Sequence, residues 1–217
     1  MTDQTFMAMR RAMVESQLRT NDVNDPVLLD AILAVPREAF LPEARRASAY
    51  IDRAVPLGKD RAINPPLATA RLIVAAEIQP GDHVLLVGAA TGYAAAVLAR
   101  LGCSVVALEE DADLVALART ALSGQAAVTL ITGDLAKGHA AGAPYDVILV
   151  DGAIEAMPDA LIDQLKVGGR AVFASAERSI TRLCAGVRSA GGFGARAFAD
   201  SEAVALPGFA PPRGFTF

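Results

Sequence analysis

Short apolar runs recur at intervals through the second half of the chain. Four of them, each leading to a glycine or an acid, predict buried strands at residues 84–88, 105–109, 128–132 and 147–151. The runs are too continuous for strands with one face in water, so we expect both faces to be covered. Helical patterns that begin at Gly92 and Asp111 separate the first three runs. This alternation is typical of a doubly wound parallel sheet.

Different patterns flank this unit on both sides. Helical spacing from Thr5 to about Tyr50 predicts a helical cap, in which Asp25 and Pro26 cap and start one helix. The segment 49–67 is rich in proline and glycine and has no sustained period, which predicts an ordered loop that leads into a helix.

The end of the chain is expected to differ from the middle. A helix over 158–166 should stop at Gly168 and Gly169, and a fifth strand should follow at 170–176. The alternation after it predicts an antiparallel hairpin around the Gly191 turn. The remaining tail is irregular, and we expect its three phenylalanines to pack on the protein. The predicted fold is therefore α/β: a doubly wound, mostly parallel Rossmann-like sheet with a helical N-terminal cap and a C-terminal antiparallel hairpin.

The region between His83 and Asp111 is the strongest candidate for a ligand site. Its strand ends in a turn of small residues, formed by Gly88, Ala89, Ala90 and Gly92. Such a turn lets a ligand approach the backbone, and the following helix offers unpaired N–H groups. Glu109, at the end of the next strand, is placed to accept hydrogen bonds from ribose hydroxyls. These features predict a ligand that contains a ribose, although a tight turn without a ligand is the alternative.

The spacing of the turn bears on which ligand it holds. A dinucleotide fingerprint would need glycines where Ala90 and Tyr93 stand, so a nicotinamide-dependent oxidoreductase is disfavoured. The turn instead resembles the GxGxG frame of S-adenosylmethionine (SAM) methyltransferases, with alanine at the second position. Asp134, which follows Gly133 at the end of the third strand, is predicted to contact the adenine edge, or else to serve as a turn acid or helix cap.

Composition limits the possible partners. The chain has 217 residues, of which 53% are hydrophobic, enough for one domain with a full core. Its formal net charge of -4 gives no basic footprint, so no nucleic-acid partner is expected. The N-terminus lacks the apolar core of a signal peptide, and we expect a cytoplasmic protein that does not bind a membrane. Cys103 and Cys184 have no metal-type spacing, so they are predicted to be small buried hydrophobes, and no metal is expected.

Several longer motifs point to a family. They are MVESQL (13–18), VPREAFLP (35–42), AYIDRAVPLG (49–58), GAATGY (88–93) and GD (133–134). With these motifs in this order, the chain resembles the protein-L-isoaspartate O-methyltransferase family up to about residue 165. The resemblance implies SAM as cofactor and methyl transfer to the carboxylate of an L-isoaspartyl residue in a damaged protein or peptide. It also divides the chain into a cap with a substrate loop, 1–67, and a SAM-binding Rossmann-like part, 68–217, within one compact unit.

The chemistry implied by the resemblance needs few acid or base groups. A carboxylate is already ionised at pH 7, and the sulfonium of SAM supplies the leaving group. Positioning then provides most of the catalysis. The absence of a catalytic histidine or cysteine is therefore no argument against an enzyme.

The residues expected around the methyl acceptor depart from the family pattern. The family's TISQP loop is matched here by Ala62, Ile63, Asn64, Pro65 and Pro66. Asn64 can still donate a hydrogen bond to a carboxylate and is predicted to be catalytic. Asp151 brings a negative charge to the acceptor site, either as an acceptor-site acid or as a turn residue beside Gly152. Three alternatives stay open: an isoaspartyl acceptor, another acceptor such as a small carboxylate, a hydroxyl or an amine, and SAM or S-adenosylhomocysteine binding without catalysis.

Overall fold

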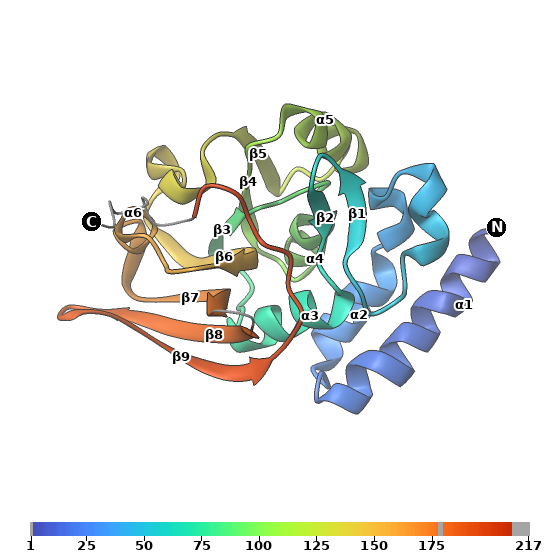
Figure 1. Cartoon of the computed structure of the whole chain (residues 1–217), viewed down its shortest axis with the longest axis horizontal. Helices are drawn as coiled ribbons and strands as arrows, with labels where there is room; N and C mark the ends of the chain where they lie inside the picture. Colours follow the sequence, from blue (N-terminus) through green and yellow to red (C-terminus); the bar gives the residue numbers. More distant parts are fainter. Residues whose placement is uncertain (1, 178–179, 210–217) are drawn as a thin grey trace, which may run out of the picture.

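A seven-stranded sheet forms the centre of the protein, which we describe from a computed structural model over residues 2–177 and 180–209. The strand order is β5-β4-β3-β6-β7-β8-β9 (Figure 1). The first five of these strands are parallel, and β8 and β9 are antiparallel additions at one edge. The bounds are β3 His83–Val87, β4 Ser104–Glu109, β5 Val128–Thr132, β6 Tyr145–Ile154, β7 Leu165–Glu177, β8 Ile180–Ser189 and β9 Gly192–Asp200. The predicted parallel sheet and C-terminal hairpin are confirmed.

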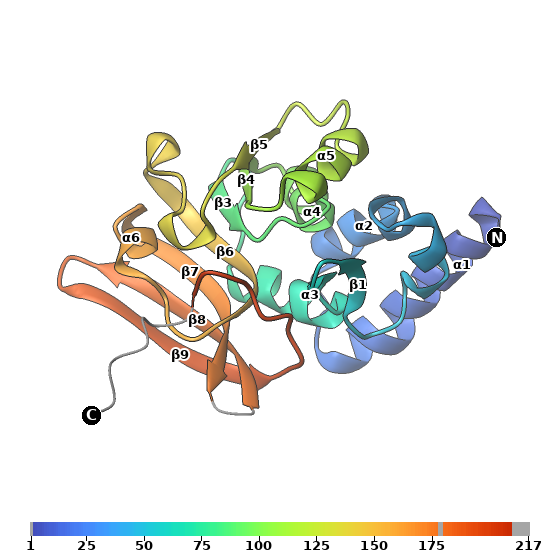
Figure 2. The ribbon, with the colours of Figure 1, turned by 45° about the horizontal axis from the view of Figure 1, so that its top comes forward.

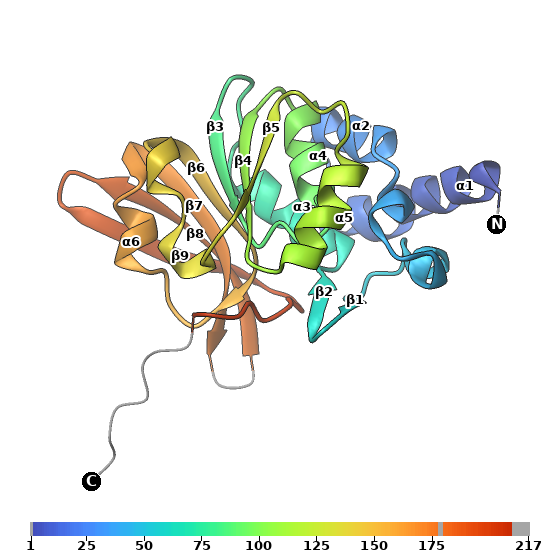
Figure 3. The ribbon, with the colours of Figure 1, turned by 90° about the horizontal axis from the view of Figure 1, so that it is seen from above.

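Both faces of the sheet are buried, as the continuous apolar runs predict. Alternate residues of β3 enter different cores: Val84 and Leu86 face one, and Leu85 and Val87 face the other. The first core is closed by the cap and by α3 Pro66–Ala75, α4 Tyr93–Arg100 and α5 Ala112–Ala121. Figure 3 shows these three helices together on one side of the sheet. The second face is covered by shorter pieces, among them α6 Asp159–Ile162 and a C-terminal segment that buries Leu206 and Phe209.

The N-terminal cap follows the predicted pattern. Its helices are α1 Asp3–Met13, continued by the π-helical turn η1 Val14–Leu18 and the 3-10 turn η2 Arg19–Asn21, then α2 Pro26–Ala34, and the 3-10 turns η3 Arg37–Phe40 and η4 Glu43–Ser48. The Asp25 carboxylate accepts a hydrogen bond of 2.8 Å from the Val27 N–H, so the predicted helix start at Asp25 and Pro26 is confirmed. Two further 3-10 turns, η5 Leu135–Lys137 and η6 Ala140–Gly142, lie between β5 and β6.

Two predictions about local structure are wrong. The segment 49–67 is not wholly irregular, because it contains an antiparallel hairpin of β1 Val55–Gly58 and β2 Arg61–Ile63. Its two turn residues, Lys59 and Asp60, have φ of 49° and 60°. Glycine or asparagine usually occupies such positions, so no residue type in the sequence signals this turn.

The helix predicted over 158–166 spans only Asp159–Ile162. Leu165 already pairs with Tyr145 in the sheet and is 2% exposed, so its burial in the second core favours the strand. Gly168 and Gly169 consequently lie inside β7 and do not end a helix.

Three smaller expectations have mixed outcomes. Cys103 and Cys184 are buried free cysteines, as predicted. Phe209 packs in the second core, whereas Phe215 and Phe217 lie outside the described residues. In the described ranges no helix is both long and apolar enough to cross a bilayer.

One arginine ties the cap together. Arg10 donates from Nε to the Tyr50 hydroxyl at 2.7 Å, from one terminal nitrogen to the Leu33 carbonyl at 2.8 Å, and from the other to Glu38 at 3.0 Å. The Tyr50 hydroxyl also donates to Glu38. Glu38 and Tyr50 belong to two of the motifs that carry the family resemblance. Part of that resemblance therefore comes from residues that hold the cap together.

This network makes a stability prediction. We expect Arg10→Ala to lower the free energy of unfolding by about 2 kcal/mol, because it leaves a half-buried carboxylate and a hydroxyl without their partner. Arg11→Ala, which removes the exposed neighbouring arginine, is the control and should change little. Urea denaturation of both variants measures the difference, and equal stabilities would show that the network contributes nothing.

Candidate active site

The residues predicted to bind the cofactor meet at one edge of the sheet. The glycine turn follows β3, Glu109 ends β4, Asp134 follows β5, and Asp151 lies in β6. These strands are parallel, so their carboxyl ends open on the same side, where ligands of open α/β sheets bind. The structure therefore brings the sequence-predicted residues into one region.

The turn after β3 requires left-handed backbone at every second residue. Gly88, Ala90 and Gly92 have φ of 78°, 49° and 96°. The Ala89 N–H, between them, donates to the Leu108 carbonyl at 3.0 Å and fixes the turn against β4. The GxAxG spacing thus has a conformational cause, and Ala90 carries a strain of roughly 1–2 kcal/mol that glycine would avoid.

The cap holds this turn from outside. The Thr91 hydroxyl donates to the Phe40 carbonyl at 2.6 Å, and both groups are buried. Tyr93 packs edge-on against the Phe40 ring, with 5.8 Å between ring centroids. Tyr93 is therefore a buried packing residue at the start of α4.

Glu109 is the most completely bonded acid of the site. Its side chain is fully buried, and Arg61 of β2 binds it with two nitrogens, at 2.5 and 2.8 Å. Backbone N–H groups of Ala90, Glu110 and Asp111 donate to the same carboxylate at 2.8, 2.9 and 3.1 Å. Glu109 thus joins the glycine turn, the start of α5 and the β1–β2 hairpin.

Asp134 has a simpler environment. Its carboxylate caps the 3-10 turn η5 through the Ala136 N–H at 3.0 Å and forms an ion pair with Lys137 at 3.1 Å. The hydrogen bond from Lys137 lowers the pKa of Asp134 below its ordinary value. The helix-cap reading is therefore observed, and contact with adenine remains a prediction.

Asn64 and Asp151, the two residues predicted to be catalytic, touch each other. The Asn64 amide donates to Asp151 Oδ1 at 2.8 Å, and the Thr69 hydroxyl donates to the same oxygen at 2.8 Å. Asn64 Oδ1 accepts from the Val204 N–H at 2.7 Å, which ties the C-terminal segment to the substrate loop. Asp151 lies within β6, so its reading as a turn residue is wrong.

The Asp151 carboxyl is held in a desolvated place. Burial raises its pKa above the ordinary value, while the hydrogen bonds from Asn64 and Thr69 act against this rise. Desolvation thus favours the neutral form of this acid.

Arg37, from the VPREAFLP motif, lies beneath the substrate loop. It donates to the Ala49 carbonyl at 2.9 Å and to the Asn64 carbonyl at 2.5 Å, and it stacks 4.7 Å from the centroid of the Tyr93 ring. Burial lowers its pKa. Arg37 therefore fixes the backbone of Asn64 to the cap, a role that the motif did not reveal.

The C-terminal segment, residues 201–209, packs against β6 and the glycine turn. Figures 1 and 2 show it, in red, crossing β6 after it leaves β9. It pairs with β6 through Ala153, whose N–H donates to the Val204 carbonyl at 2.7 Å and whose carbonyl accepts from the Leu206 N–H at 2.9 Å. The Leu206 side chain lies 2.8 Å from where a Cβ on Gly88 would stand. Glycine at 88 is therefore needed for this close approach as well as for the turn.

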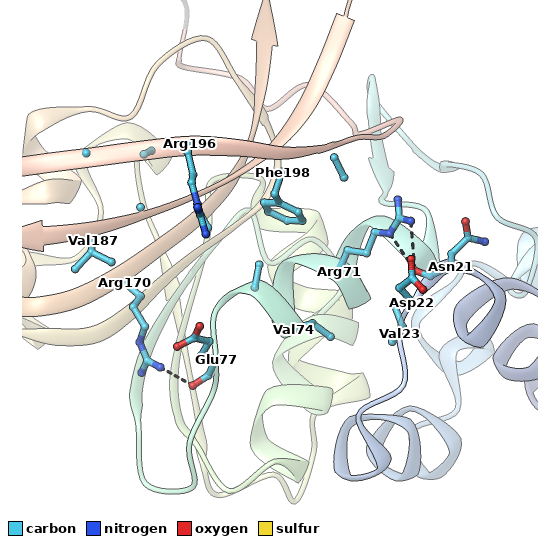
Figure 4. A pocket seen from close by; sticks show the side chains of 16 residues that line it. Asn21, Asp22, Val23, Arg71, Val74, Glu77, Arg170, Val187, Arg196 and Phe198 are labelled. Atoms are coloured by element: carbon cyan, nitrogen blue, oxygen red, sulfur yellow. Dashed lines mark hydrogen bonds between the residues drawn. The ribbon is translucent and has the colours of Figure 1, made fainter.

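A hollow in the described part of the protein lies away from the predicted site residues, and a metal-type cluster is not found there. No group of three or more His, Cys, Asp or Glu among residues 2–177 and 180–209 is arranged to hold a metal ion. A hollow of about 850 Å³ lies between α3 and the β8–β9 edge. Figure 4 shows its wall, which includes Val74, Phe198 and Arg196. None of the predicted site residues lines it.

Three residues of the site were missed from the sequence. Arg61, Thr69 and Leu206 reach it from the hairpin, from α3 and from the C-terminal segment. Their contacts join positions more than 40 residues apart, and none follows a local pattern.

The sheet topology and the glycine turn are those of a class I methyltransferase fold. A solved protein-L-isoaspartate O-methyltransferase superposes with a TM-score of 0.82 at 23% identity, over 92% of this chain and 67% of the other. A second, from Plasmodium falciparum and in complex with S-adenosyl-L-homocysteine, has a TM-score of 0.77 at 20% identity, over 92% and 98%. At these identities the likeness concerns the fold.

Sequence comparison gives the family. The model of the protein-L-isoaspartate(D-aspartate) O-methyltransferase family matches residues 8–189. A protein-L-isoaspartate O-methyltransferase of Methylorubrum extorquens is 46% identical over 164 residues, 75% of this chain and 72% of that protein. One of Koribacter versatilis is 42% identical over 173 residues, 78% of each. The chain belongs to the protein-L-isoaspartate O-methyltransferase family, which confirms the resemblance seen in the motifs.

The strain at Ala90 predicts a stabilising substitution. Ala90→Gly should raise the free energy of unfolding by up to about 1 kcal/mol, because glycine adopts positive φ without cost. Ala89→Gly is the matched control and should destabilise, since it removes a buried methyl group where no positive φ is required. Chemical denaturation compares the two, and a loss of stability in Ala90→Gly would contradict the assigned strain.

The raised pKa of Asp151 predicts a pH dependence. Below the ordinary carboxyl pKa the group is neutral in both the folded and unfolded states. As pH rises through the raised pKa, the folded state must hold a desolvated charge, so this stabilising contribution is lost. Asp151→Asn keeps an oxygen that can accept from Asn64 and Thr69 but carries no charge.

We therefore expect Asp151→Asn to gain stability relative to the parent protein as the pH goes from about 4 to 7. Denaturation at several pH values measures the difference between the two proteins. A difference that does not change with pH, or that changes in the other direction, would show that burial does not raise the pKa of Asp151.

Proposed function

We propose that this protein transfers the methyl group of SAM to a carboxylate oxygen of an L-isoaspartyl residue in a damaged protein or peptide. The observation that carries the proposal is the buried Glu109 carboxylate at the end of β4, beside a turn with left-handed backbone at Gly88, Ala90 and Gly92. The names of the Methylorubrum and Koribacter relatives support the same acceptor.

The side chains at this edge suit a nucleoside. Glu109 offers a carboxylate for the two ribose hydroxyls, and the start of α4 offers backbone N–H groups. The turn residues Gly88, Ala89, Ala90 and Gly92 would let a ligand lie against the backbone, and Asp134, at the neighbouring strand end, would contact the adenine edge. Residues 68–217 would thus hold the cofactor, while 1–67 would contribute the cap and the acceptor loop.

Bound SAM supplies a methyl group on a positively charged sulfur. In the transfer, a bond would form between the acceptor oxygen and the methyl carbon while the carbon–sulfur bond breaks, and the electron pair of the broken bond would stay on sulfur. No proton moves, so no general base is needed. The protein must instead hold the acceptor in line and away from water, a contribution that reaches about 7–11 kcal/mol in well-oriented reactions.

Asn64 and Asp151 are the residues that would orient the acceptor. One N–H of the Asn64 amide is engaged with Asp151, and the cluster is pinned by Thr69 and Arg37. An acceptor carboxylate would accept from the Asn64 amide, and the raised pKa of Asp151 reduces the repulsion between the two acids. In its ionised form the same acid could instead accept a proton from a hydroxyl or amine, so acceptors of these two kinds are the alternative to be assayed.

The direct test uses methyl-labelled SAM. An isoaspartyl peptide should gain base-labile methyl ester, and the matching aspartyl peptide should not. Labelling of neither peptide, with SAM binding shown by calorimetry, would overturn the isoaspartyl assignment and favour another acceptor or a protein that only binds the cofactor. Small carboxylates, hydroxyl compounds and amines are then the next acceptors to assay.

Variants of two adjacent acids test the cofactor site. Glu109→Gln should lower kcat/KM for SAM by about 100-fold, since an amide cannot accept from both ribose hydroxyls. Glu110→Gln, at the exposed neighbouring position, should leave the rate unchanged. Thermal unfolding of both variants separates lost binding from lost folding. Equal rates for two folded variants would place the ribose elsewhere.

A further inference from the structure

Arg61 occupies the carboxylate that the cofactor needs. It binds both oxygens of Glu109, the carboxylate predicted to bind the ribose, and it is itself 6% exposed. We infer that Arg61 and the ribose of the cofactor compete for Glu109, so that Arg61 sets the affinity of this site for SAM and S-adenosylhomocysteine. This inference rests on the proposed function, because it takes the cofactor to be a ribose-containing nucleoside.

The bonding capacity of Glu109 makes the two occupants exclusive. A carboxylate offers about four lone-pair positions. Five hydrogen bonds already end on Glu109, three from backbone N–H groups and two from Arg61. The backbone donors are fixed by the glycine turn and the start of α5, so they cannot leave without unfolding that edge. Only the guanidinium of Arg61 is free to make room for two hydroxyls.

The location of Arg61 permits this movement. It belongs to the β1–β2 hairpin, a two-stranded sheet separate from the seven-stranded one. Figure 3 shows the hairpin outside the main sheet, beside α3. Its tip is also held to α5 by an ion pair between Lys59 and Asp113, but both side chains are more than two-thirds exposed. Such surface pairs contribute little, so the tip is weakly attached.

The guanidinium of Arg61 is also not fully hydrogen-bonded while it binds Glu109. Nε of Arg61 is buried and has no hydrogen-bond partner. A buried donor without a partner costs about 1–3 kcal/mol, and this cost is relieved when Arg61 moves into water. The closed arrangement is therefore one state of an equilibrium, and the apparent dissociation constant of the cofactor is the intrinsic value divided by the open fraction.

Calorimetric titration with S-adenosylhomocysteine tests the inference on three variants. Arg61→Gln removes the charged competitor and should bind about tenfold more tightly than the parent protein. Arg61→Lys keeps the charge but loses the two-pronged contact, and should fall between them. Arg53→Gln, which changes an exposed arginine just before β1, is the matched control and should bind like the parent.

Each result of the titration either supports or overturns competition between Arg61 and the ligand. Tighter binding by Arg61→Gln, including binding by this variant alone, supports competition. Equal or weaker binding by Arg61→Gln, with binding by the parent, overturns the competition but leaves the proposed function standing. Absence of binding in all four proteins overturns both, because removal of Arg61 would then have failed to open the site.

A measurement on the unchanged protein covers the case in which Arg61→Gln does not fold. Hydrogen–deuterium exchange of the hairpin, residues 55–63, should become faster when S-adenosylhomocysteine is added, because the ligand displaces Arg61 from Glu109. Exchange in α4 should become slower, which reports that the ligand is bound. Slower exchange in both segments would show that the hairpin closes over the ligand without giving up Glu109, and would overturn the inference.

Discussion

A carboxylate buried at the end of an interior strand has to be surrounded by donors, and Glu109 obtains them from three parts of the chain. The glycine turn and the start of α5 supply backbone N–H groups, and the hairpin supplies Arg61. The positive φ angles of the turn allow the Ala90 N–H to point at Glu109. The shape of this edge of the sheet therefore depends on satisfying one acid.

The other parts of the site are built from outside the sheet and pack onto that edge. The cap reaches it through Phe40 and Arg37, and the C-terminal segment reaches it through Val204 and Leu206. Such enclosure suits a methyl transfer that needs position and exclusion of water more than proton transfer. Asn64 of the substrate loop is held to the cap by Arg37 and to the C-terminal segment by Val204.

The sheet could be predicted because burial on both faces leaves continuous apolar runs, as at 84–88, and because parallel strands collect their carboxyl ends. Glu109 followed from that geometry alone. Arg61 did not, because its hairpin turns at Lys59 and Asp60, residues that give no turn signal, and because its partner lies 48 positions away. The helix at 158–166 was predicted too long because the burial of Leu165 in the second core overrides a local helical pattern.

The most direct measurement is a pair of crystal structures, one without ligand and one with S-adenosylhomocysteine. In the first, Arg61 should bind Glu109 with two nitrogens. In the second, the ribose hydroxyls should take its place and the guanidinium should lie away from the carboxylate. A ligand bound with its ribose elsewhere, or one bound while Arg61 still holds both oxygens of Glu109, would contradict the account.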